Sequence, residues 1–144
     1  MDRFAYPAQL TPDEGGSFMV RFRDLPEAIT SGRNLDDAIE QAADCLQEAL
    51  AGRLVRRDTI PKPSRQRRGE RLIPVAVYLA PKLALFGAME RSAVTSSELA
   101  HRLGVTEPAV RRMVSPKHET KPGEIEAALR ALGKEVVVHV SDAA

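Results

Sequence analysis

Aromatic residues and cysteine are scarce in this chain of 144 residues. Tryptophan is absent, aromatic residues make up 4% of the chain, and cysteine occurs once, as Cys45. A single cysteine excludes an internal disulfide framework and a metal site built from several cysteines, which suits a reducing compartment. So few aromatic side chains predict small cores, and we expect two small domains whose stability depends on oligomerisation.

Long apolar runs are also missing. No run approaches the roughly 18 residues needed to span a membrane. The first residues, which include Asp2, Arg3 and Pro7, lack the hydrophobic core of a signal peptide. We therefore expect a cytoplasmic protein.

The net charge of +1 conceals an uneven distribution of charge along the chain. Residues 1–53 carry ten acidic and five basic residues, whereas residues 54–71 carry seven basic and two acidic ones. This division predicts two different partners, a basic one for the first half and nucleic acid for the second.

Residues 95–113, TSSELAHRLGVTEPAVRRM, have the spacing of a helix-turn-helix. Thr95 and Glu98 form a capping box at the start of one helix, Gly104 can end that helix, and Thr106 can cap the next. The simpler alternative is an ordinary helical hairpin, since capped helices joined by glycine are common.

The small residues at the turn and the arginines after it resemble the helix-turn-helix of the Cro/repressor type, whose second helix lies in the major groove. The resemblance implies base contacts from the start of the second helix and phosphate contacts around it. The residues expected at DNA are Ser96, Ser97, Thr106, Glu107, Pro108, Arg111, Arg112 and Lys117.

The first half shows the pattern of a small sheet followed by a helix. Alternating apolar residues predict strands at 4–10 and 18–22, joined by a glycine turn, and a short third strand at 28–31. Asn34 is expected to cap an amphipathic helix that runs from residue 35 to Gly52.

Two stretches of this half, DEGGSFMVRF at 13–22 and DLPEAITSGRNLDDAIEQAADCL at 24–46, closely resemble the N-terminal domain of HicB-type antitoxins. The resemblance covers about residues 3–53, and a strand expected at 72–79 would complete the domain. It implies a reduced RNase H-like fold that binds a small basic HicA toxin, an mRNA-cleaving ribonuclease. Some members of this family end in a helix-turn-helix, as this chain does by its pattern.

An acidic surface suits a toxin built to hold RNA, because opposite potentials favour the encounter. Two of the carboxylates expected to bind the toxin, Asp36 and Asp37, are equally explained as ordinary acids at a helix start. The expected residues are Glu14, Asp24, Glu27, Asp36 and Asp37.

Residues 54–71 contain two prolines and little apolar pattern, so we expect an extended connector that forms a solvated tether or adds affinity for DNA. Helices are expected at 81–89 and 122–132. The β-branched stretch 135–140 predicts a strand without a mate in a helical domain. We expect it to pair across a two-fold axis; alternatively, it joins the N-terminal sheet or folds onto its own domain.

Catalysis is not expected. The acidic half has no convergent set of carboxylates for a two-metal nuclease, and none of the three histidines has a partner at metal-ligand spacing. We therefore expect no enzyme activity, no metal and no cofactor. A metal-dependent ribonuclease remains the third hypothesis.

These patterns together predict an α+β protein. We expect a toxin-binding domain at 1–80, which includes the connector 54–71, and a helix-turn-helix domain at 81–144 that ends in a strand. The predicted function is that of a type II antitoxin that neutralises a HicA-like toxin and represses its own operon as a homodimer or homotetramer. The alternative is a stand-alone transcriptional regulator whose N-terminal domain senses a ligand or protein.

Overall fold

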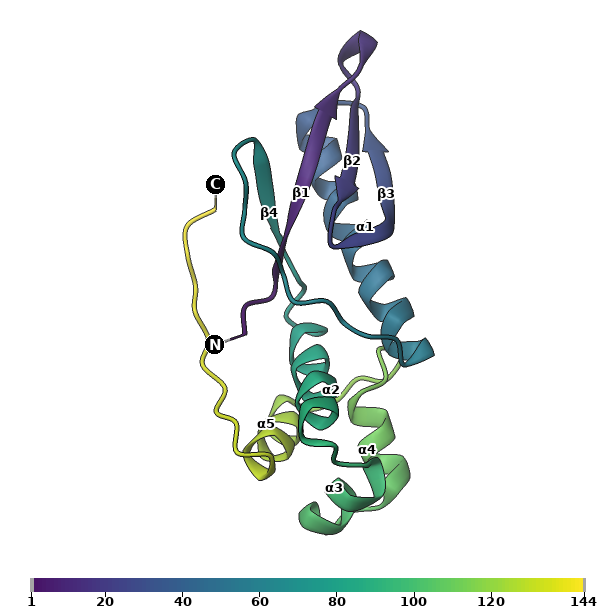
Figure 1. Cartoon of the computed structure of the whole chain (residues 1–144), viewed down its shortest axis with the longest axis vertical. Coiled ribbons are helices and arrows are strands. Elements are labelled where there is room, and N and C mark those ends of the chain that lie inside the picture. The colour runs from purple at the N-terminus through teal and green to yellow at the C-terminus, as the bar shows by residue number, and fades with distance from the viewer. Residues whose placement is uncertain (1, 144) are drawn as a thin grey trace. The chain divides into compact units, whose positions relative to one another are not determined.

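Four antiparallel strands and one long helix form the first part of the chain (Figure 1). The computed structural model describes residues 2–143 and divides the chain into unit 1, residues 1–80, and unit 2, residues 81–144. The sheet of unit 1 has the order β3-β2-β1-β4. Its strands are β1 (Ala5–Pro12), β2 (Phe18–Phe22), β3 (Leu25–Gly32) and β4 (Glu70–Pro74).

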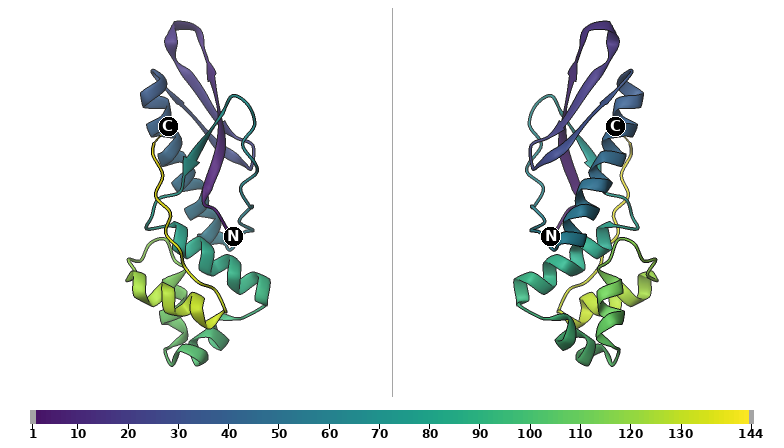
Figure 2. Two further views of the ribbon diagram at one scale, coloured as in Figure 1. Left: turned by 90° about the vertical axis from the view of Figure 1, so that its left-hand side faces the viewer. Right: turned by 90° about the vertical axis from the view of Figure 1, so that its right-hand side faces the viewer.

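The core of unit 1 lies between the sheet and helix α1 (Leu35–Arg56), which packs mainly on β3 (Figure 2). Val20 and Phe22 are buried and Arg21 is exposed, so the predicted alternation of the second strand is confirmed. The buried positions of α1 recur every four residues, as one face of a helix requires. They are Ala38, Ala42, Leu46, Leu50 and Leu54.

Close packing explains one glycine at the end of β3. A Cβ atom built on Gly32 would lie 2.2 Å from the backbone nitrogen of Ala38. The sheet and the first turn of α1 therefore touch without room for any side chain. Asn34 caps the helix as predicted, since its side-chain oxygen accepts a hydrogen bond from the Asp37 amide at 2.9 Å.

Three predicted boundaries in unit 1 are wrong. The third strand, expected at 28–31, begins already at Leu25, whose side chain is buried in the core. The helix does not stop at Gly52 but continues to residue 56, because Leu54 adds another buried side chain to the core. The strand expected at 72–79 covers only the range of β4 and ends at Pro74, which cannot donate to a ladder. Val77 and Tyr78 lie exposed in the turn that follows.

The connector 54–71 is fastened to unit 1 instead of forming a free tether. The Tyr6 hydroxyl donates to the Pro61 carbonyl at 2.6 Å, and the Ser64 amide donates to Asp24 at 2.8 Å. Burial raises the pKa of Tyr6 to about 12. Because the segment leads from α1 into β4, it forms part of the fold of this unit.

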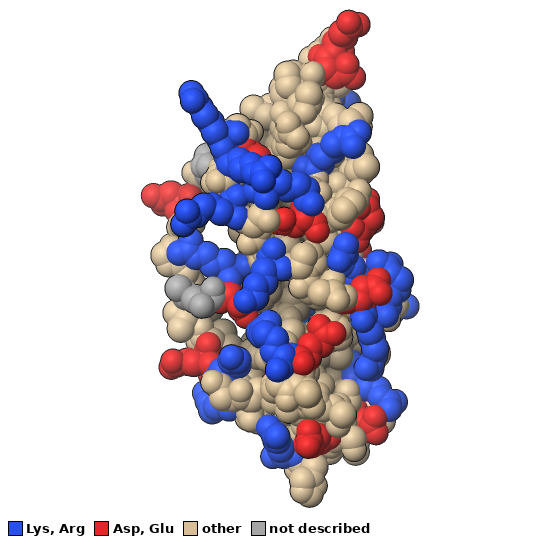
Figure 3. Space-filling model, in the orientation of Figure 1, with Lys and Arg blue, Asp and Glu red and all other residues tan. Residues whose placement is uncertain are grey.

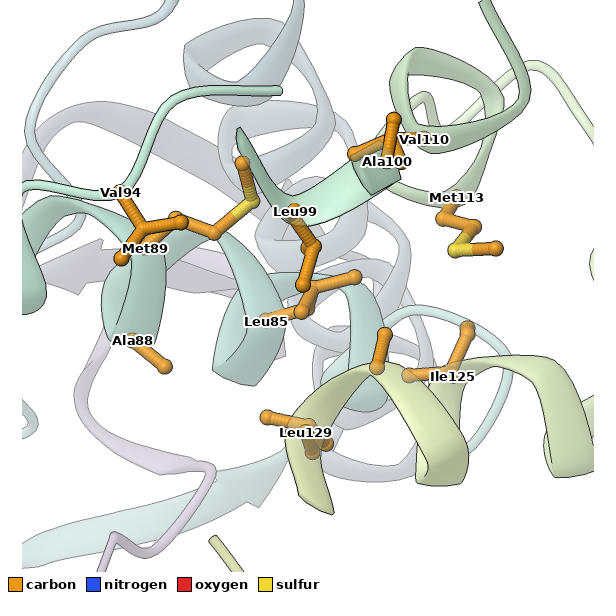
Figure 4. Packing of buried hydrophobic residues seen from close by; sticks show 11 residues of the cluster. Leu85, Ala88, Met89, Val94, Leu99, Ala100, Val110, Met113, Ile125 and Leu129 are labelled. Atoms are coloured by element: carbon orange, nitrogen blue, oxygen red, sulfur yellow. The ribbon is translucent and has the colours of Figure 1, made fainter. Parts of the chain in front are cut away.

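Four helices make up unit 2: α2 (Ala80–Ser92), α3 (Ser96–Leu103), α4 (Glu107–Met113) and α5 (Pro122–Ala131). Each contributes apolar side chains to one cluster, in which Leu85, Leu99, Val110 and Ile125 are buried (Figure 4). The mixed α+β class predicted from the sequence is thereby confirmed.

The C-terminal stretch differs from its prediction. Residues 134–143 form neither helix nor strand. A strand needs a neighbouring edge that supplies hydrogen bonds, and the described residues of unit 2 contain no other strand. The expected strand at 135–140 is therefore not formed within this chain.

Candidate functional site

Helices α3 and α4 meet at a short turn whose geometry follows from three local signals. Thr95 accepts a hydrogen bond from the Glu98 amide at 3.1 Å, and Thr106 accepts one from the Ala109 amide at 3.3 Å. Gly104 closes α3 in the left-handed conformation, with φ of 66°. Both caps and the glycine stop lie where the sequence predicts them, because each involves only neighbours in the chain.

The surface of α4 presents charged and polar side chains to solvent. Val110 and Met113 point into the core, which leaves Pro108, Arg111 and Arg112 exposed. Arg111 forms an ion pair with Glu107 one turn earlier. Two of the predicted DNA-contacting side chains, Glu107 and Arg111, therefore hold each other in the free protein.

The remaining predicted DNA-contacting residues lie around the same two helices. Ser97 on α3 and Lys117 after α4 are exposed, whereas Ser96 is partly buried. Thr106 is exposed but its hydroxyl is already used as a helix cap. The structure thus brings the predicted set together on α3, α4 and the loop that follows.

A buried lysine fixes the end of α4, and the sequence reasoning missed it. Lys82 on α2 is 3% exposed. Its Nζ donates to the carbonyls of Arg112 at 3.2 Å and Met113 at 3.1 Å, and to the Thr120 hydroxyl at 2.8 Å. Burial lowers the pKa of Lys82. A cation at the C-terminal end of a helix satisfies carbonyls that have no partner within the helix.

Three members of the predicted acidic set have hydrogen-bond partners within unit 1. Asp24 accepts hydrogen bonds from Ser64. Glu27 accepts two from Arg53, at 2.7 and 3.0 Å. Asp37 accepts from the Arg33 amide at 2.9 Å.

The other two predicted carboxylates lie on two different elements, and Asp36 directly precedes Asp37 in the chain. Glu14 lies in η1 (Glu14–Gly16), the turn between β1 and β2, and Figure 3 shows acidic side chains at this tip. Asp36 lies exposed in the first turn of α1.

Asp36 begins a stripe of carboxylates that the sequence reasoning did not single out. Asp36, Glu40, Asp44 and Glu48 are all exposed and follow one another at four-residue spacing on α1. We call them the acidic stripe. No ion pair joins any of the four to another residue within 2–143. The four-residue period of these acids was the available signal.

Such a stripe weakens its own helix. Like charges four residues apart destabilise a helix by about 0.2–0.5 kcal/mol per pair. The stripe contains three successive pairs of this kind, and no described cation pairs with them. The arrangement can favour a cationic partner at this face of unit 1.

Another part of unit 1 has the opposite charge. A groove of about 410 Å³ is lined by Arg21, Arg23, Arg67 and Arg68, with Glu70 between them. Arg23 donates to both carboxylate oxygens of Glu70, at 3.2 and 3.0 Å, and this contact lowers the pKa of Glu70. Figure 3 shows Lys and Arg side chains gathered around β4 and the turn that leads into it. A basic partner would be repelled there.

Known proteins match both units of this chain. The sequence profile described as HicB_like antitoxin of bacterial toxin-antitoxin system matches residues 5–84. "Antitoxin HicB" of Escherichia coli strain K12 is 37% identical over 131 residues, which is 91% of this chain and 95% of the relative. The chain belongs to the HicB-like antitoxin family. "Antitoxin HicB 2" of Photorhabdus laumondii is 37% identical over 129 residues, covering 90% and 91% of the two chains, and "Antitoxin HicB" of Pseudomonas fluorescens is 30% identical over 132 residues, covering 91% and 90%.

Membership of the HicB-like family confirms the resemblance seen in residues 13–46. It identifies the chain as a non-enzymatic antitoxin of a toxin-antitoxin system. Within residues 2–143, no group of three or more histidine, cysteine or carboxylate side chains could hold a metal ion. None of the described helices is both long enough and apolar enough to cross a membrane.

Proposed function

We propose that this antitoxin neutralises a HicA-type toxin through unit 1 and represses its own operon through unit 2, without a cofactor. The observation that carries the proposal is that relatives named antitoxin HicB align with at least 90% of this chain, so the similarity extends over both units. In this proposal the toxin-binding domain is unit 1 and the DNA-binding domain is unit 2, both acting in the cytoplasm.

The acidic stripe is the surface that we assign to the toxin. A ribonuclease that holds RNA phosphates needs a basic surface, and carboxylates that lack internal partners can meet it without first breaking an ion pair. The carboxylate of Glu14, at the exposed β1–β2 turn, is also available. Asp24, Glu27 and Asp37 support this surface by holding the fold, since their oxygens are already engaged.

A four-fold neutral variant tests this assignment. We expect D36N/E40Q/D44N/E48Q to fold like the original chain, because the loss of like-charge repulsion on α1 offsets the loss of the favourable Asp36 charge at the start of the helix. Its association with a HicA-type toxin should slow by at least about tenfold at low salt and differ little at high salt. Surface plasmon resonance measures the rate, and rescue of growth on co-expression measures neutralisation.

The matched control neutralises four exposed carboxylates of unit 2 in the variant E98Q/E119Q/E124Q/E135Q. It changes the net charge by the same amount, so it separates a local surface from overall charge. Equal rates for the two variants would remove the stripe from the proposal. Failure of the unaltered chain to bind or neutralise the toxin would overturn the antitoxin mechanism itself.

Helices α3 and α4 are the proposed operator-binding element, with α4 in the major groove. Its exposed arginines and the cap-fixed turn support this assignment. Fluorescence anisotropy with duplexes from the upstream region and with random sequence tests it. We expect tighter binding to the upstream duplex; equal affinity for both would contradict operator recognition.

A further inference from the structure

The basic groove on unit 1 is lined by arginines of which most lack an acidic partner. Arg21, Arg23, Arg67 and Arg68 line it together with one acidic residue, Glu70, so four positive charges face a single negative one. Arg23 pairs with Glu70, and no described carboxylate forms an ion pair with the other three guanidinium groups. We call this the arginine groove. Unpaired cations gathered in one groove favour an anionic ligand.

The strands place part of the arginine groove on the face of the sheet that turns away from α1. Gln9 on β1 lies opposite Arg21 on β2, and Arg21 lies opposite Ile29 on β3. The residue before each of these three is buried in the core. Because side chains alternate along a strand, the three groove residues face solvent on the other side. The arginine groove and the acidic stripe therefore belong to different layers of unit 1.

The arginine groove offers surface for flat bases as well as charge for phosphates. An arginine side chain can donate two parallel hydrogen bonds to a phosphate and can also stack on a flat ring. Pro26 and Ile29 line the same groove, and Ile29 is 49% exposed. This combination suits a single nucleic-acid strand, whose base faces are open, better than a duplex, whose bases stay stacked.

A strand also suits the groove better than a free nucleotide. A small ligand usually buries roughly 70–90% of its surface in its site. All four arginines of the groove are exposed, so a single nucleotide bound there would keep much of its surface in solvent. A longer strand compensates, because contacts that are weak one by one add up along a connected chain.

Gln9 points to ribose as the sugar of this strand. Its side chain is exposed, makes no hydrogen bond within the described residues, and lies opposite Arg21 on the neighbouring strand. Neighbouring strands are about 4.8 Å apart, so the amide and the guanidinium can reach the sugar and the phosphate of one nucleotide. The 2′-hydroxyl of ribose can pair with an amide as donor or acceptor, and deoxyribose lacks it.

We propose that the arginine groove binds single-stranded RNA, with Arg21, Arg67 and Arg68 at the phosphates and Gln9 at a ribose 2′-hydroxyl. The site is separate from the acidic stripe and from α4, so the inference goes beyond the toxin and operator contacts proposed above. Binding is measured with neither toxin nor operator present, so its failure would leave both of those proposals standing.

Neutralising the three unpaired arginines tests the site in the full-length chain. The probe is a fluorescein-labelled RNA strand of mixed sequence, about 15 nucleotides long, followed by fluorescence anisotropy. R21Q/R67Q/R68Q should bind it at least about tenfold more weakly at low salt, because phosphate contacts are lost. The slope of log affinity against log salt concentration should fall by about two, since each phosphate contact on a single strand contributes about 0.7. Circular dichroism should stay unchanged, because these side chains have no ion pair to lose.

The matched control R3Q/K121Q/K134Q removes three exposed cations that lie outside the groove. Its affinity for the RNA strand should change less than about threefold, which separates the groove from overall charge. The variant R111Q/R112Q separates the groove from α4: it should keep its affinity for RNA and lose affinity for the upstream duplex, while R21Q/R67Q/R68Q should do the reverse. Equal losses of RNA binding in the groove variant and the matched control would overturn the proposal.

The variant Q9L tests the choice of RNA over DNA. The unaltered chain should bind the RNA strand at least about threefold more tightly than a DNA strand of the same sequence, and Q9L should bring the two affinities together. Equal affinity of the unaltered chain for both strands would overturn the assignment to RNA. Displacement of the RNA by polyglutamate of equal charge would show that the groove accepts any acidic chain, and absence of RNA binding by the unaltered chain would remove the site altogether.

Discussion

Glu27 on β3 and Arg53 on α1 are joined by two hydrogen bonds, and this pair controls how one carboxyl group titrates. The hydrogen bonds to Arg53 lower the pKa of Glu27 to about 2, against 4.5 ordinarily. Because the folded value lies below the unfolded one, the stabilisation is fully present above pH 4.5 and is lost as the pH falls through about 2.

We expect R53M to return the pKa of Glu27 toward its ordinary value. The titration of the Glu27 carboxyl carbon by NMR measures this shift. Arg56, which pairs with Asp58, provides the control R56M, and its effect on Glu27 should be small because its contribution is a minor one. A Glu27 titration that is unchanged in R53M would contradict the assignment.

Lys82 donates hydrogen bonds to the C-terminal end of α4. K82M would leave the carbonyls of Arg112 and Met113 without the donor that they share. We expect the free energy of unfolding to fall by about 1–3 kcal/mol, because buried polar groups that lose a partner carry a cost of this size. Chemical denaturation measures the loss.

Lys121 supplies the control for this substitution. It is exposed and makes no side-chain cap bond at the start of α5, so K121M should change stability by less than about 0.5 kcal/mol. Equal stability of K82M and the original chain would show that the lysine is replaceable by an apolar side chain of similar length.

At the scale of elements, the local signals of the sequence predicted structure best. Asn34, Thr95, Gly104 and Thr106 act within four residues of themselves, so their roles follow from the sequence alone. The core faces of β2 and α1 followed from periodicity for the same reason.

What the sequence did not predict depends mostly on contacts between distant residues. The connector is fastened through Asp24 and Ser64, which are 40 residues apart, and no local pattern marks that pair. Lys82 meets α4 across 30 residues. The partners of Glu27 and Asp37 were not foreseen either: Arg53 holds Glu27 across 26 residues, and Arg33 holds Asp37 four residues away. Contact of these two carboxylates with a toxin stays a prediction.

The two exposed arginines of α4 are predicted to differ in what they read. R111A should weaken binding to the operator by about 1–3 kcal/mol and change binding to random DNA little. R112A should weaken binding to both duplexes equally, since a phosphate contact carries no sequence information. It should also reduce the slope of log affinity against log salt concentration by about one, because one phosphate contact is lost. Anisotropy titrations on both duplexes at several salt concentrations distinguish them. Equal losses on both duplexes for R111A would show that it touches only phosphate.

At the scale of the whole molecule, the charge division of the chain takes a more specific form in the structure. The acidity of residues 1–53 is concentrated along α1, while the basic residues of 54–71 contribute to an arginine-lined groove elsewhere in the same unit. One unit therefore offers a cationic toxin one favourable face and one unfavourable face. This difference in charge between the two faces would orient a cationic toxin on unit 1 as well as attract it.

The expected homodimer leads to a prediction about DNA that a single chain does not make. Two helix-turn-helix elements related by a two-fold axis bind an inverted repeat whose half-sites lie about one helical turn apart. Duplexes whose half-site spacing is changed by about half a turn should bind the dimer with the affinity of a single half-site, because the second α4 then faces the wrong side of the helix. Anisotropy titrations across a spacer series measure this dependence on half-site spacing. Spacing-independent binding by the unaltered dimer would mean that the two units are not held about a fixed axis.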